Sequence, residues 1–553
     1  MTTNVSRGGS EEVASKLRPV HDGPRHGAAE VAAGIFASRI VGFIRERVLA
    51  HYFGTSEAAD AFRSALRIPN FLQNLFGDGV LSGSFIPVYA RLLGEKNQVE
   101  ADRVAGVVAT LLAIVVSILA LIGVLITPFM ISLIAPGFEG EKRLLTIRLV
   151  RILFPGIALL VMSAWCLGIL NSHRRFFLSY AAPVVWNLAI IGTLLLFGGR
   201  QAQLDLAVTA AWGLVLGCFL QLAVQLPTVF KLLTKFRPSV DIRSKHVQNV
   251  LGSFGSVVVA RGVVQISAYV DNMLASLSHA GAVSVLGYAQ TLSLLPISLF
   301  GMSVSAVSLA EMARSRGEGA QTSTAESNEA LRTQLERGLR QIAFFIVPSM
   351  TAYMAVGDVV IAALYKTGKF SQNDIHYVWA ALAGSALGLL PSTLGRLYSS
   401  TFYAVEDTRS PLRFAIIRVA LTTALGYVAG VRLPRYLGFD MSWSIACITV
   451  TSSVAGWIEL LMLRNRMNDR IGRSWIPWSF LWRISLAALV ASAIAVGVRI
   501  LLDLWMPWFP PFLAVVPIFG CFGTTYLGAA VLLRIPEATS AMNRVTRRVR
   551  RRH

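Results

Sequence analysis

The chain has 553 residues, of which 54% are hydrophobic and 15% are charged, and its formal net charge is +21. Soluble domains carry about 25% charged residues, whereas an apolar run of about 20 residues can cross a bilayer as a helix. Such runs recur from Ala28 to Leu533 with little between them, which excludes a water-soluble fold and predicts an all-α polytopic membrane protein.

The predicted elements begin after a polar stretch. Residues 1–27 have no apolar core near their start, so we expect a disordered cytoplasmic tail and not a cleaved signal, and the first span stays in the mature protein. Glycine, proline and charged residues then separate about 14 predicted transmembrane helices. Their centres fall near residues 41, 77, 117, 156, 188, 217, 261, 298, 349, 388, 421, 452, 492 and 522.

The positively charged residues predict the orientation of the chain. Most of the 51 lysines and arginines lie in the tails and in the even-numbered connections. Because cytoplasmic connections carry the excess of lysine and arginine, both termini are expected in the cytoplasm. The basic Arg544–Arg552 tail would then lie against anionic lipid headgroups. We expect no nucleic acid partner, since membrane topology already accounts for the charge.

Residues 314–341 form the one long connection between predicted spans. This connection is rich in serine and glycine and then places Leu331, Leu335 and Leu339 at four-residue spacing, which predicts an amphipathic helix on the membrane surface. Its position divides the spans into two lobes around a central cavity. The predicted parts are a tail at 1–27, an N-terminal lobe of spans 1–8 at 28–313, the connection at 314–341, a C-terminal lobe of spans 9–12 at 342–475, spans 13–14 at 476–534 and a basic cytoplasmic tail at 535–553.

The first two spans carry charges that a bilayer tolerates only beside a wet cavity or a partner group. On the first span, Arg39 and Glu46 share one helical face, and Arg45 flanks them. The second span carries a polar stripe at helical spacing, formed by Asp60, Arg63, Arg67, Asn70 and Asn74. One interpretation is a set of ion pairs that locks the two helices together. Because arginines outnumber acids on these faces, we favour an anion site in which guanidinium groups bind phosphate.

A third polar stripe lies on span seven. Arg261 sits near the centre of this span, and Gln265 and Asn272 share its face. An unpaired arginine at that depth would cost several kcal/mol, so it needs an anion, either a carboxylate or a bound substrate. A purely structural ion pair is an equally good interpretation of Arg261.

Enzymatic chemistry has little support in the sequence. Membrane enzymes that transfer or cleave phosphate-linked lipids need clustered aspartates for a metal or a histidine nucleophile. This chain has no DxxD motif, and its eight histidines are scattered. The four cysteines lie singly inside apolar runs, which excludes a disulfide framework and a CxxC metal site. We therefore expect neither an enzyme nor a bound cofactor.

Short motifs follow one another in a fixed order along the chain. The amino-terminal group comprises Ser38–Glu46, Phe53-Gly54, Asp60-Ala61-Phe62, Arg67–Asn70 and Phe85-Ile86-Pro87. The later group includes Ala135–Phe138, Phe154-Pro155, Ala182-Pro183 with Asn187, Gln225-Leu226-Pro227, Gly368-Lys369-Phe370 and Phe402-Tyr403-Ala404. In order and spacing these motifs resemble the MurJ, or MviN, family of lipid II flippases in the multidrug/oligosaccharidyl-lipid/polysaccharide exporter superfamily. The resemblance covers about residues 30–535.

The resemblance implies both a fold and a function. It implies 14 helices in two lobes around a central cavity, with a groove for the polyprenyl tail formed by spans 13 and 14. It also implies that lipid II, an undecaprenyl-pyrophosphate-linked saccharide-peptide, moves by alternating access to the outer leaflet of a bacterial inner membrane. That transport serves peptidoglycan biosynthesis, cell wall biogenesis and cell shape. The partners would be lipid II and membrane lipids, with the cell-wall synthesis machinery left open.

The resemblance also assigns roles to individual positions. Arg39, Arg45 and Asp60 fall on family positions that are usually important for transport, and Glu46 replaces a common aspartate. Asp271 matches an aspartate that helps to bind sodium in some members, although the matching polar residues on span eleven are replaced around Ala420 and Ala424. The complete set of candidate substrate-binding residues is Arg39, Arg45, Glu46, Asp60, Arg63, Arg67, Asn70 and Arg261, with Asp271 as a candidate sodium ligand.

Two departures from the family pattern leave three functional alternatives. Gln73 replaces a common arginine, and Gln290-Thr291 replaces an acidic-basic pair. The chain is either a flippase in which Arg63, Arg67 or Arg261 substitutes for the missing cations, an exporter of another lipid-linked saccharide, or a degenerate flippase-like scaffold in cell-envelope assembly. The sequence does not determine whether transport is coupled to sodium or to the membrane potential. It also does not determine the exact lipid headgroup or the oligomeric state.

Overall fold

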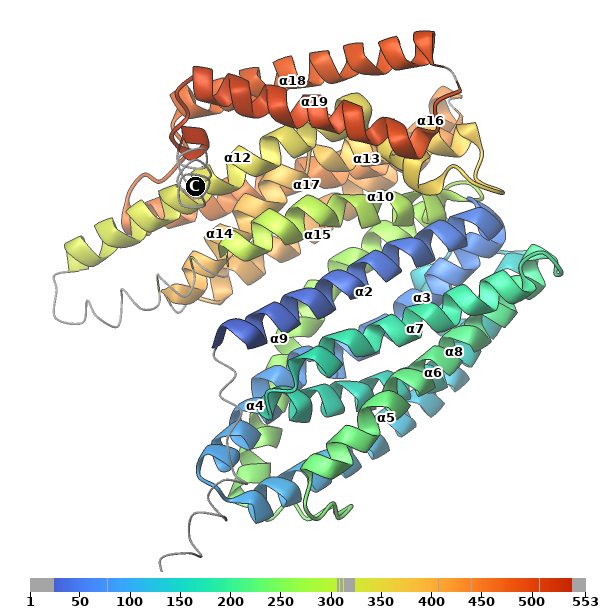
Figure 1. Ribbon diagram of the computed structural model, residues 1–553, viewed down its shortest axis with the longest axis vertical. Coiled ribbons are helices and arrows are strands. Elements are labelled where there is room, and N and C mark those ends of the chain that lie inside the picture. Colours follow the sequence, from blue (N-terminus) through green and yellow to red (C-terminus); the bar gives the residue numbers. More distant parts are fainter. Residues whose placement is uncertain are drawn as a thin grey trace, which may run out of the picture.

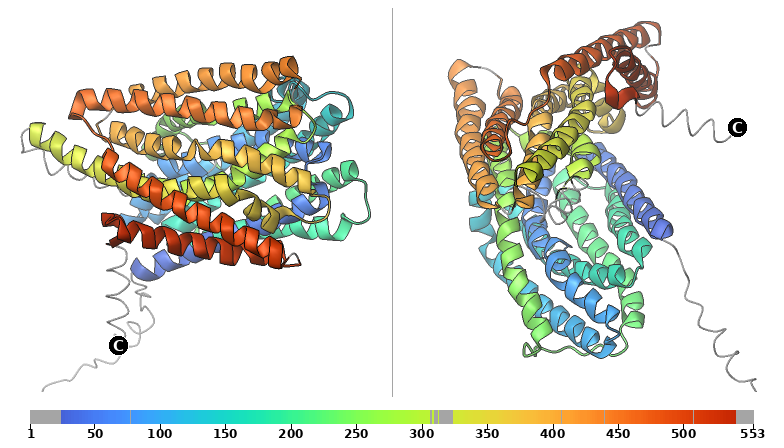
Figure 2. Two further views of the ribbon diagram at one scale, coloured as in Figure 1. Left: turned by 90° about the horizontal axis from the view of Figure 1, so that it is seen from above. Right: turned by 90° about the vertical axis from the view of Figure 1, so that its left-hand side faces the viewer.

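The computed structural model describes residues 24–539 apart from 77, 306–307, 309–311, 313–323, 406, 439 and 507. At some further positions, including 24–32 and 255–268, it describes the backbone alone. Over this part of the chain the regular structure is helical, as predicted. The helices form two bundles, one coloured blue to green and one yellow to red in Figure 1, and most helices run roughly parallel to one another in Figure 2.

The N-terminal bundle packs its helices around one apolar core. Phe85, Phe154 and Trp165 are among its largest buried side chains, each at most 2% exposed. Its longest helix begins at Asn97, whose side chain accepts a hydrogen bond from the Glu100 backbone N–H and so satisfies one terminal donor. The helices are α2 (Pro24–Phe53), α3 (Glu57–Phe76), α4 (Asp78–Gly94), α5 (Gln98–Ile134), α6 (Gly140–Ser172), α7 (Phe176–Phe197) and α8 (Gln203–Leu232).

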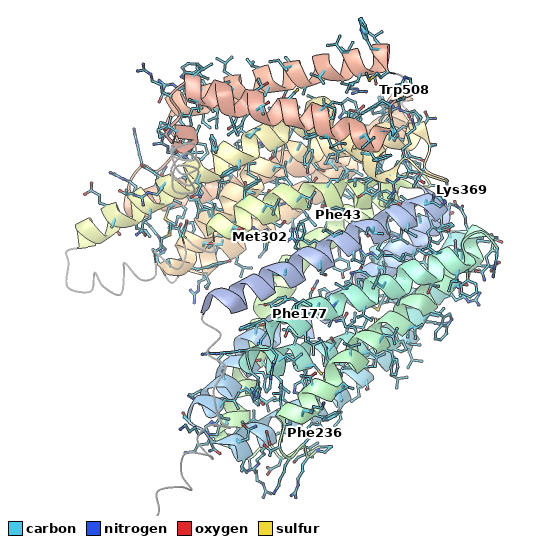
Figure 3. The ribbon with its side chains drawn as sticks, viewed as in Figure 1. Phe43, Phe177, Phe236, Met302, Lys369 and Trp508 are labelled. Atoms are coloured by element: carbon cyan, nitrogen blue, oxygen red, sulfur yellow. The ribbon has the colours of Figure 1, made fainter. Side chains whose placement is uncertain are left out.

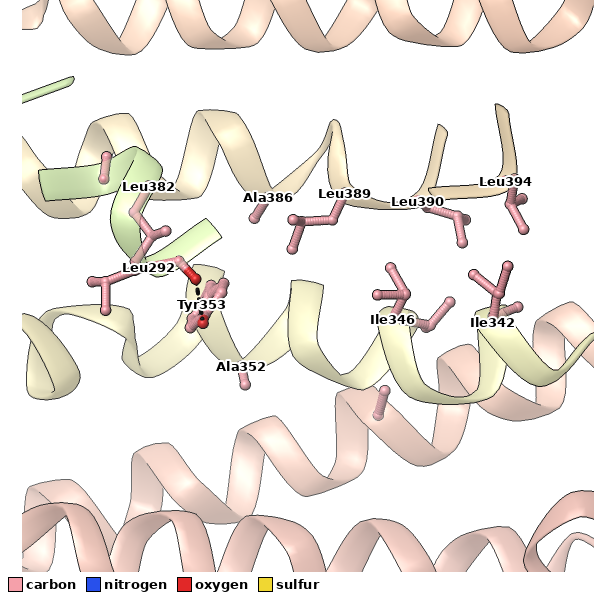
Figure 4. Packing of buried hydrophobic residues seen from close by; sticks show 14 of the residues in the cluster. Leu292, Ile342, Ile346, Ala352, Tyr353, Leu382, Ala386, Leu389, Leu390 and Leu394 are labelled. Carbon is pink, nitrogen blue, oxygen red and sulfur yellow. Dashed lines mark hydrogen bonds between the residues drawn. The ribbon is translucent and has the colours of Figure 1, made fainter. Parts of the chain in front are cut away.

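The C-terminal bundle has a second apolar core. Figure 4 shows Ile342 and Ile346 facing Leu390 and Leu394 of a neighbouring helix within it. Its helical segments are α10 (Ala282–Pro296), η1 (Ile297–Met302), α12 (Thr324–Tyr365), α13 (Gln372–Ala386), α14 (Leu389–Ala404), α15 (Arg409–Tyr427), η3 (Val428–Arg432), α16 (Leu433–Leu437), η4 (Met441–Trp443), α17 (Ser444–Ile471), α18 (Trp478–Trp505) and α19 (Pro511–Leu532).

Helix α9 (Lys245–Ser276) joins the two bundles, because it packs against α4 and α5 on one side and against α15 and α17 on the other. Of the buried apolar residues that belong to either core, those up to Val250 lie in the N-terminal core, except Ala50, Ala135 and Phe138, and those from Leu274 onward lie in the C-terminal core. The cores therefore divide the chain within α9, whereas the sequence places the lobe boundary at residue 313. The difference arises because α10, the eighth predicted span, packs against α13.

The number of spans agrees with the expectation of about 14. Eleven stretches of described helix are long and apolar enough to cross a membrane. The remaining three predicted spans are α2, the pair α3 and α4, and α9. These three carry the charged stripes described above, which lowers their mean hydropathy. The second predicted span, centred near residue 77, consists of two helices that meet at that position.

The predicted amphipathic helix is the first part of α12. This element covers 42 residues and joins the connection to the ninth span, with a kink at the non-helical residue Val356. Leu331, Leu335 and Leu339 are at most 3% exposed and belong to the C-terminal core. These leucines therefore pack inside the protein and not on the membrane surface, where the sequence had predicted them. Four-residue spacing indicates an apolar helix face, but it does not distinguish a lipid neighbour from a protein neighbour.

The last two helices, α18 and α19, form a hairpin that packs on α12 (Figure 1). Arg499 of α18 makes two short contacts with the Asp358 carboxylate of α12, at 2.9 and 2.7 Å. Near the other end of the hairpin, the Tyr526 hydroxyl donates a 2.6 Å hydrogen bond to the Phe344 carbonyl. Arg340 of α12 also lies 3.1 Å from Glu537, just beyond α19. The hairpin is thus attached to α12 near both of its ends.

Replacing Leu335 by alanine tests the burial of the first part of α12. Leu335→Ala should lower the free energy of unfolding by about 2–5 kcal/mol, because it leaves a cavity in a packed core. Thermal unfolding of the purified chain in detergent measures this loss. Thr333→Ala, at an exposed position on the same helix, is the matched control and should change stability by less than about 0.5 kcal/mol. Equal effects of the two substitutions would place Leu335 outside the core.

Candidate functional site

The centre of the charged region is a contact between two arginines and one glutamate. The Glu46 carboxylate of α2 accepts hydrogen bonds from Arg45 at Oε1 and from Arg63 of α3 at Oε2, both at 2.7 Å. Glu46 is buried, with 7% of its surface exposed. The sequence placed these three residues on facing stripes, and the structure brings them into contact. One carboxylate forms ion pairs with two guanidinium groups, so the net charge of the cluster is +1.

Two further helices hold the arginines in place. Arg45 donates a 2.9 Å hydrogen bond to Asn187 Oδ1 of α7, and its guanidinium lies 4.9 Å from the centroid of the Trp186 ring. The Arg63 guanidinium lies 4.0 Å from the centroid of the Tyr288 ring on α10. Tyr288 belongs to the C-terminal core, so the cluster spans the interface between the two bundles. Aromatic faces attract cations and help to offset their desolvation.

Trp186, Asn187 and Tyr288 were missed as site residues by the sequence analysis. Asn187 appears in a family motif, but no chemistry was assigned to it. A polar amide in the middle of the apolar span at Phe176–Phe197 is the signal that could have identified Asn187, since a buried amide needs a partner. Tyr288 offers no comparable signal, because its role depends on the distant Arg63.

Arg39 and Arg67 flank the cluster on either side. Arg39 is exposed and donates a 2.9 Å hydrogen bond to the Ser298 hydroxyl of η1. Arg67 donates to Gln290 Oε1 of α10 at 2.9 Å, and the Tyr269 hydroxyl of α9 donates to the Arg67 carbonyl at 2.8 Å. Gln290, noted above as a departure from the family pattern, is therefore the neutral partner of a candidate cation. All four arginines of the first two stripes face the C-terminal bundle or the Glu46 cluster.

Asp60 lies apart from this cluster. It is fully buried, and its Oδ2 atom lies 2.7 Å from the Lys142 ammonium and accepts a hydrogen bond from the Gly281 backbone N–H. Its Oδ1 atom accepts hydrogen bonds from both the backbone N–H and the hydroxyl of Ser284. The carboxylate thus neutralises a lysine and caps the first turn of α10, which leaves it engaged with protein groups. The sequence placed Asp60 among the candidate substrate-binding residues; in the structure its carboxylate contacts protein groups from distant segments and lies outside the Arg45–Glu46–Arg63 cluster.

Asn70 and Arg261 are the two remaining candidates for substrate binding. Asn70 is exposed on α3. Arg261 lies on α9, within a stretch whose side chains fall outside the described residues.

The two bundles meet closely at the end of the molecule where α2 ends. Arg47 donates to the Ala363 and Leu364 carbonyls in the last turn of α12, at 2.6 and 2.9 Å. The Lys369 backbone N–H donates to the His51 carbonyl at 2.8 Å, and Figure 3 labels Lys369 at this junction. Gly368 has φ of +54°, and a Cβ atom there would lie 2.3 Å from the His51 carbonyl oxygen. Only glycine allows so close an approach.

Further contacts strengthen the same junction. Tyr288 donates a 3.1 Å hydrogen bond to the Gly54 carbonyl, and the hydroxyl of Thr55 is hydrogen-bonded to Asp374. The contacts of Asp60 with α10 lie at this end as well. Because these bonds join both bundles, this end of the molecule is closed.

Asp271, the candidate sodium ligand, has neighbours of opposite charge. Arg418 and Arg67 are the charged groups that act on its carboxylate, so a sodium ion would have to bind beside two guanidinium groups. Ala420 and Ala424 offer no side-chain oxygen on α15. Among the residues that the structure describes, no group of three His, Cys, Asp or Glu side chains could hold a metal ion.

Comparisons with known proteins agree on one family. Residues 49–517 match the family described as "Lipid II flippase MurJ". The probable lipid II flippase MurJ of Rhizobium tropici is 31% identical over 489 residues, which cover 86% of this chain and 87% of that protein. The lipid II flippase MurJ of Burkholderia cenocepacia is 29% identical over 419 residues, covering 74% and 79% of the two chains.

Solved structures show the same fold. A lipid II flippase MurJ in an inward closed conformation superposes with a TM-score of 0.72 at 24% identity, covering 91% of this chain and 98% of the other. An inward-facing multidrug resistance MATE family transporter of the MOP superfamily has a TM-score of 0.62 at 18% identity, covering 78% and 95% of the chains. The two-bundle architecture is therefore shared well beyond close sequence similarity.

Replacing Asp60 tests its structural role. Asp60→Ala should lower the free energy of unfolding by about 3–5 kcal/mol, since it leaves Lys142 buried without its partner. Glu57→Ala, at an exposed position in the first turn of the same helix, is the control and should cost less than about 1 kcal/mol. Thermal unfolding in detergent compares the two variants. Unchanged stability of Asp60→Ala would contradict this role.

Proposed function

The chain belongs to the lipid II flippase MurJ family of membrane transporters, which are not enzymes, and we propose that it carries lipid II from the cytoplasmic to the outer leaflet. It is a multi-pass membrane protein, and the family function places it in peptidoglycan biosynthesis and cell wall biogenesis. Alternating access between the two bundles and binding of the pyrophosphate by cavity arginines complete the proposal. The termini would both lie in the cytoplasm.

The Arg45–Glu46–Arg63 contact is the observation that carries this proposal. Two guanidinium groups converge on one carboxylate at 2.7 Å, in a region where the first span would cross the membrane. A pyrophosphate carries more negative charge than a carboxylate and offers oxygen atoms suited to paired N–H donors. Glu46 therefore occupies, in the absence of substrate, the place that the pyrophosphate would take. When lipid II binds, the two arginines would exchange Glu46 for phosphate oxygens.

The position of the cluster supports a coupling between binding and the movement of the bundles. Arg63 contacts the Tyr288 ring, and Arg67 contacts Gln290, both on α10 of the C-terminal bundle. A substrate that draws these arginines away from Glu46 would change contacts across the interface. The closed junction around His51 and Lys369 supports a resting state that is shut toward the outer face and receives lipid II from the cytoplasm.

The two other functions inferred from sequence differ in the experiments they predict. An exporter of another lipid-linked saccharide would transport that lipid and not lipid II. A degenerate scaffold would fold, bind a stable partner and transport neither. Rescue of a bacterial strain depleted of its lipid II flippase, followed by transport of purified lipid II in vesicles, separates the three alternatives. We expect this chain to rescue growth and to transport lipid II.

Removing Arg45 should disable transport without loss of the protein. Arg45→Ala deletes one charge-assisted contact with the pyrophosphate, which should weaken lipid II binding by about 10- to 100-fold. Binding to the purified chain and rescue of the depleted strain measure the effect, with membrane abundance determined in parallel. Arg200→Ala, an exposed arginine outside the cluster, is the control and should rescue normally. Normal growth on Arg45→Ala would remove Arg45 from the substrate site.

The orientation can be tested by labelling single introduced cysteines. In a variant lacking the four native cysteines, Gly199→Cys should react with an impermeant thiol reagent added to intact cells, and Thr234→Cys should react only after lysis. Both positions are exposed, and a Cβ atom at residue 199 meets no neighbour within 4 Å. The reverse labelling pattern would place the termini outside the cytoplasm and overturn the proposed direction of transport.

A further inference from the structure

A second cationic cavity lies at the end of α15, away from the Glu46 cluster. There the helix continues through the π-helical segment η3 into the short helix α16. The cavity has a volume of about 610 Å³ and is lined by Tyr427, Val428, Arg432, Leu433, Arg435 and Tyr436. It lies at the same end of the molecule as Lys369, which is the end that we assign to the outer face (Figures 1 and 3).

The π-helical segment explains how the lining residues come together. In a π-helix, hydrogen bonds join residues five positions apart, so Tyr427 and Arg432 lie one above the other. Arg432 Nε donates a 3.3 Å hydrogen bond to the Tyr427 hydroxyl, and its guanidinium lies 5.8 Å from the ring centroid. A Cβ atom on Gly430 would lie 2.3 Å from Ile448, so glycine is needed for this turn to pack on α17. The backbone thus fixes Arg432 at the cavity.

The two arginines keep donors that protein groups do not use. Arg435 donates one hydrogen bond to the Leu277 carbonyl at the end of α9, at 3.2 Å. Within the described part of the chain, neither Arg432 nor Arg435 forms an ion pair, in contrast to Arg499 and Arg418. Each guanidinium has five N–H donors in a planar arrangement that matches phosphate oxygens. The cavity is therefore suited to an anion.

The apolar part of the lining narrows the choice of anion. Val428 is 56% exposed, Leu433 is 46% exposed and Tyr436 is 88% exposed, and all three line the same cavity as the arginines. Tyrosine is enriched where the hydrocarbon of a bilayer meets its headgroups. A ligand that uses the whole cavity has an anionic head and an apolar chain. A small inorganic anion would leave the apolar lining uncovered.

We propose that this cavity binds an anionic phospholipid of the outer leaflet. Its phosphate would lie between Arg432 and Arg435, and its acyl chains would run along Val428 and Leu433. The site shares no residue with the Arg45–Glu46–Arg63 cluster and does not depend on the transport function. It also accounts for a pair of arginines in a connection on the face that carries few of them.

Photo-crosslinking to phosphatidylglycerol tests the site. The full-length chain is reconstituted in nanodiscs that contain phosphatidylglycerol with a photoreactive group in the acyl chain, and the adducts are located by peptide mass spectrometry. We expect adducts on residues 427–436. Arg432→Gln removes one guanidinium that holds the phosphate and should lower their yield about tenfold. Phosphatidylcholine carrying the same photoreactive group should give a severalfold lower yield than phosphatidylglycerol.

Matched variants and competitors separate the other outcomes. Arg200→Gln removes an exposed arginine at the same end of the molecule and should leave the yield unchanged. Thermal unfolding verifies that each variant is folded. If Arg432→Gln does not fold, Tyr436→Ala, at a highly exposed position, replaces it and should also lower the yield.

Three results would overturn the proposal. The first is an unchanged yield in a folded Arg432→Gln or Tyr436→Ala variant. The second is equally effective displacement by millimolar inorganic phosphate, which would indicate a site for free anions. The third is stronger displacement by lipid II than by phosphatidylglycerol, which would assign the cavity to the transported lipid.

Discussion

The cost of placing a guanidinium group in a bilayer is the constraint on which the rest of this structure depends. Glu46 offsets this free-energy cost by forming ion pairs with both Arg45 and Arg63. In the same way Asp358 pairs with Arg499, and Glu459 pairs with Arg418. The spans that carry the charged stripes lie where the two bundles meet, whereas α5, which has no charged residue after Arg103, presents many exposed aliphatic side chains. Pairing with Glu46 thus offsets the cost of the arginines at the interface, and the other two pairs do the same within the C-terminal bundle.

The sequence predicted the helical class, the approximate number of spans and the approach of Arg45, Glu46 and Arg63, since these features depend on local periodicity. It did not predict the surroundings of Asp60, because Lys142, Gly281 and Ser284 come from distant segments. It also placed Leu331 and its neighbours on lipid, because an apolar face has the same spacing whatever covers it. The division of the cores at α9 depends on helix packing, which has no signature in the sequence.

The closed end of the molecule uses the ends of two helices. Arg47 places a cation on the terminal carbonyls of α12, and Asp60 places an anion on the first N–H groups of α10. Each charge lies at the helix end whose dipole has the opposite sign. Both contacts therefore stabilise the arrangement in which the two bundles touch at this end. Separating the bundles at this end would expose backbone groups as well as side chains.

The length of α12 has a consequence for how this protein is stabilised. The part of α12 before its kink at Val356, residues 324–355, is about 48 Å long at 1.5 Å per residue, longer than the hydrocarbon layer of about 30 Å. Its first turns therefore stand in water, where Leu331, Leu335 and Leu339 still pack in the C-terminal core. One continuous helix is thus folded in two solvents. Water drives burial of leucine in the aqueous part, whereas dispersion and polar contacts hold the part in lipid. Urea would therefore destabilise the aqueous part of α12, whereas detergent would destabilise the part in lipid.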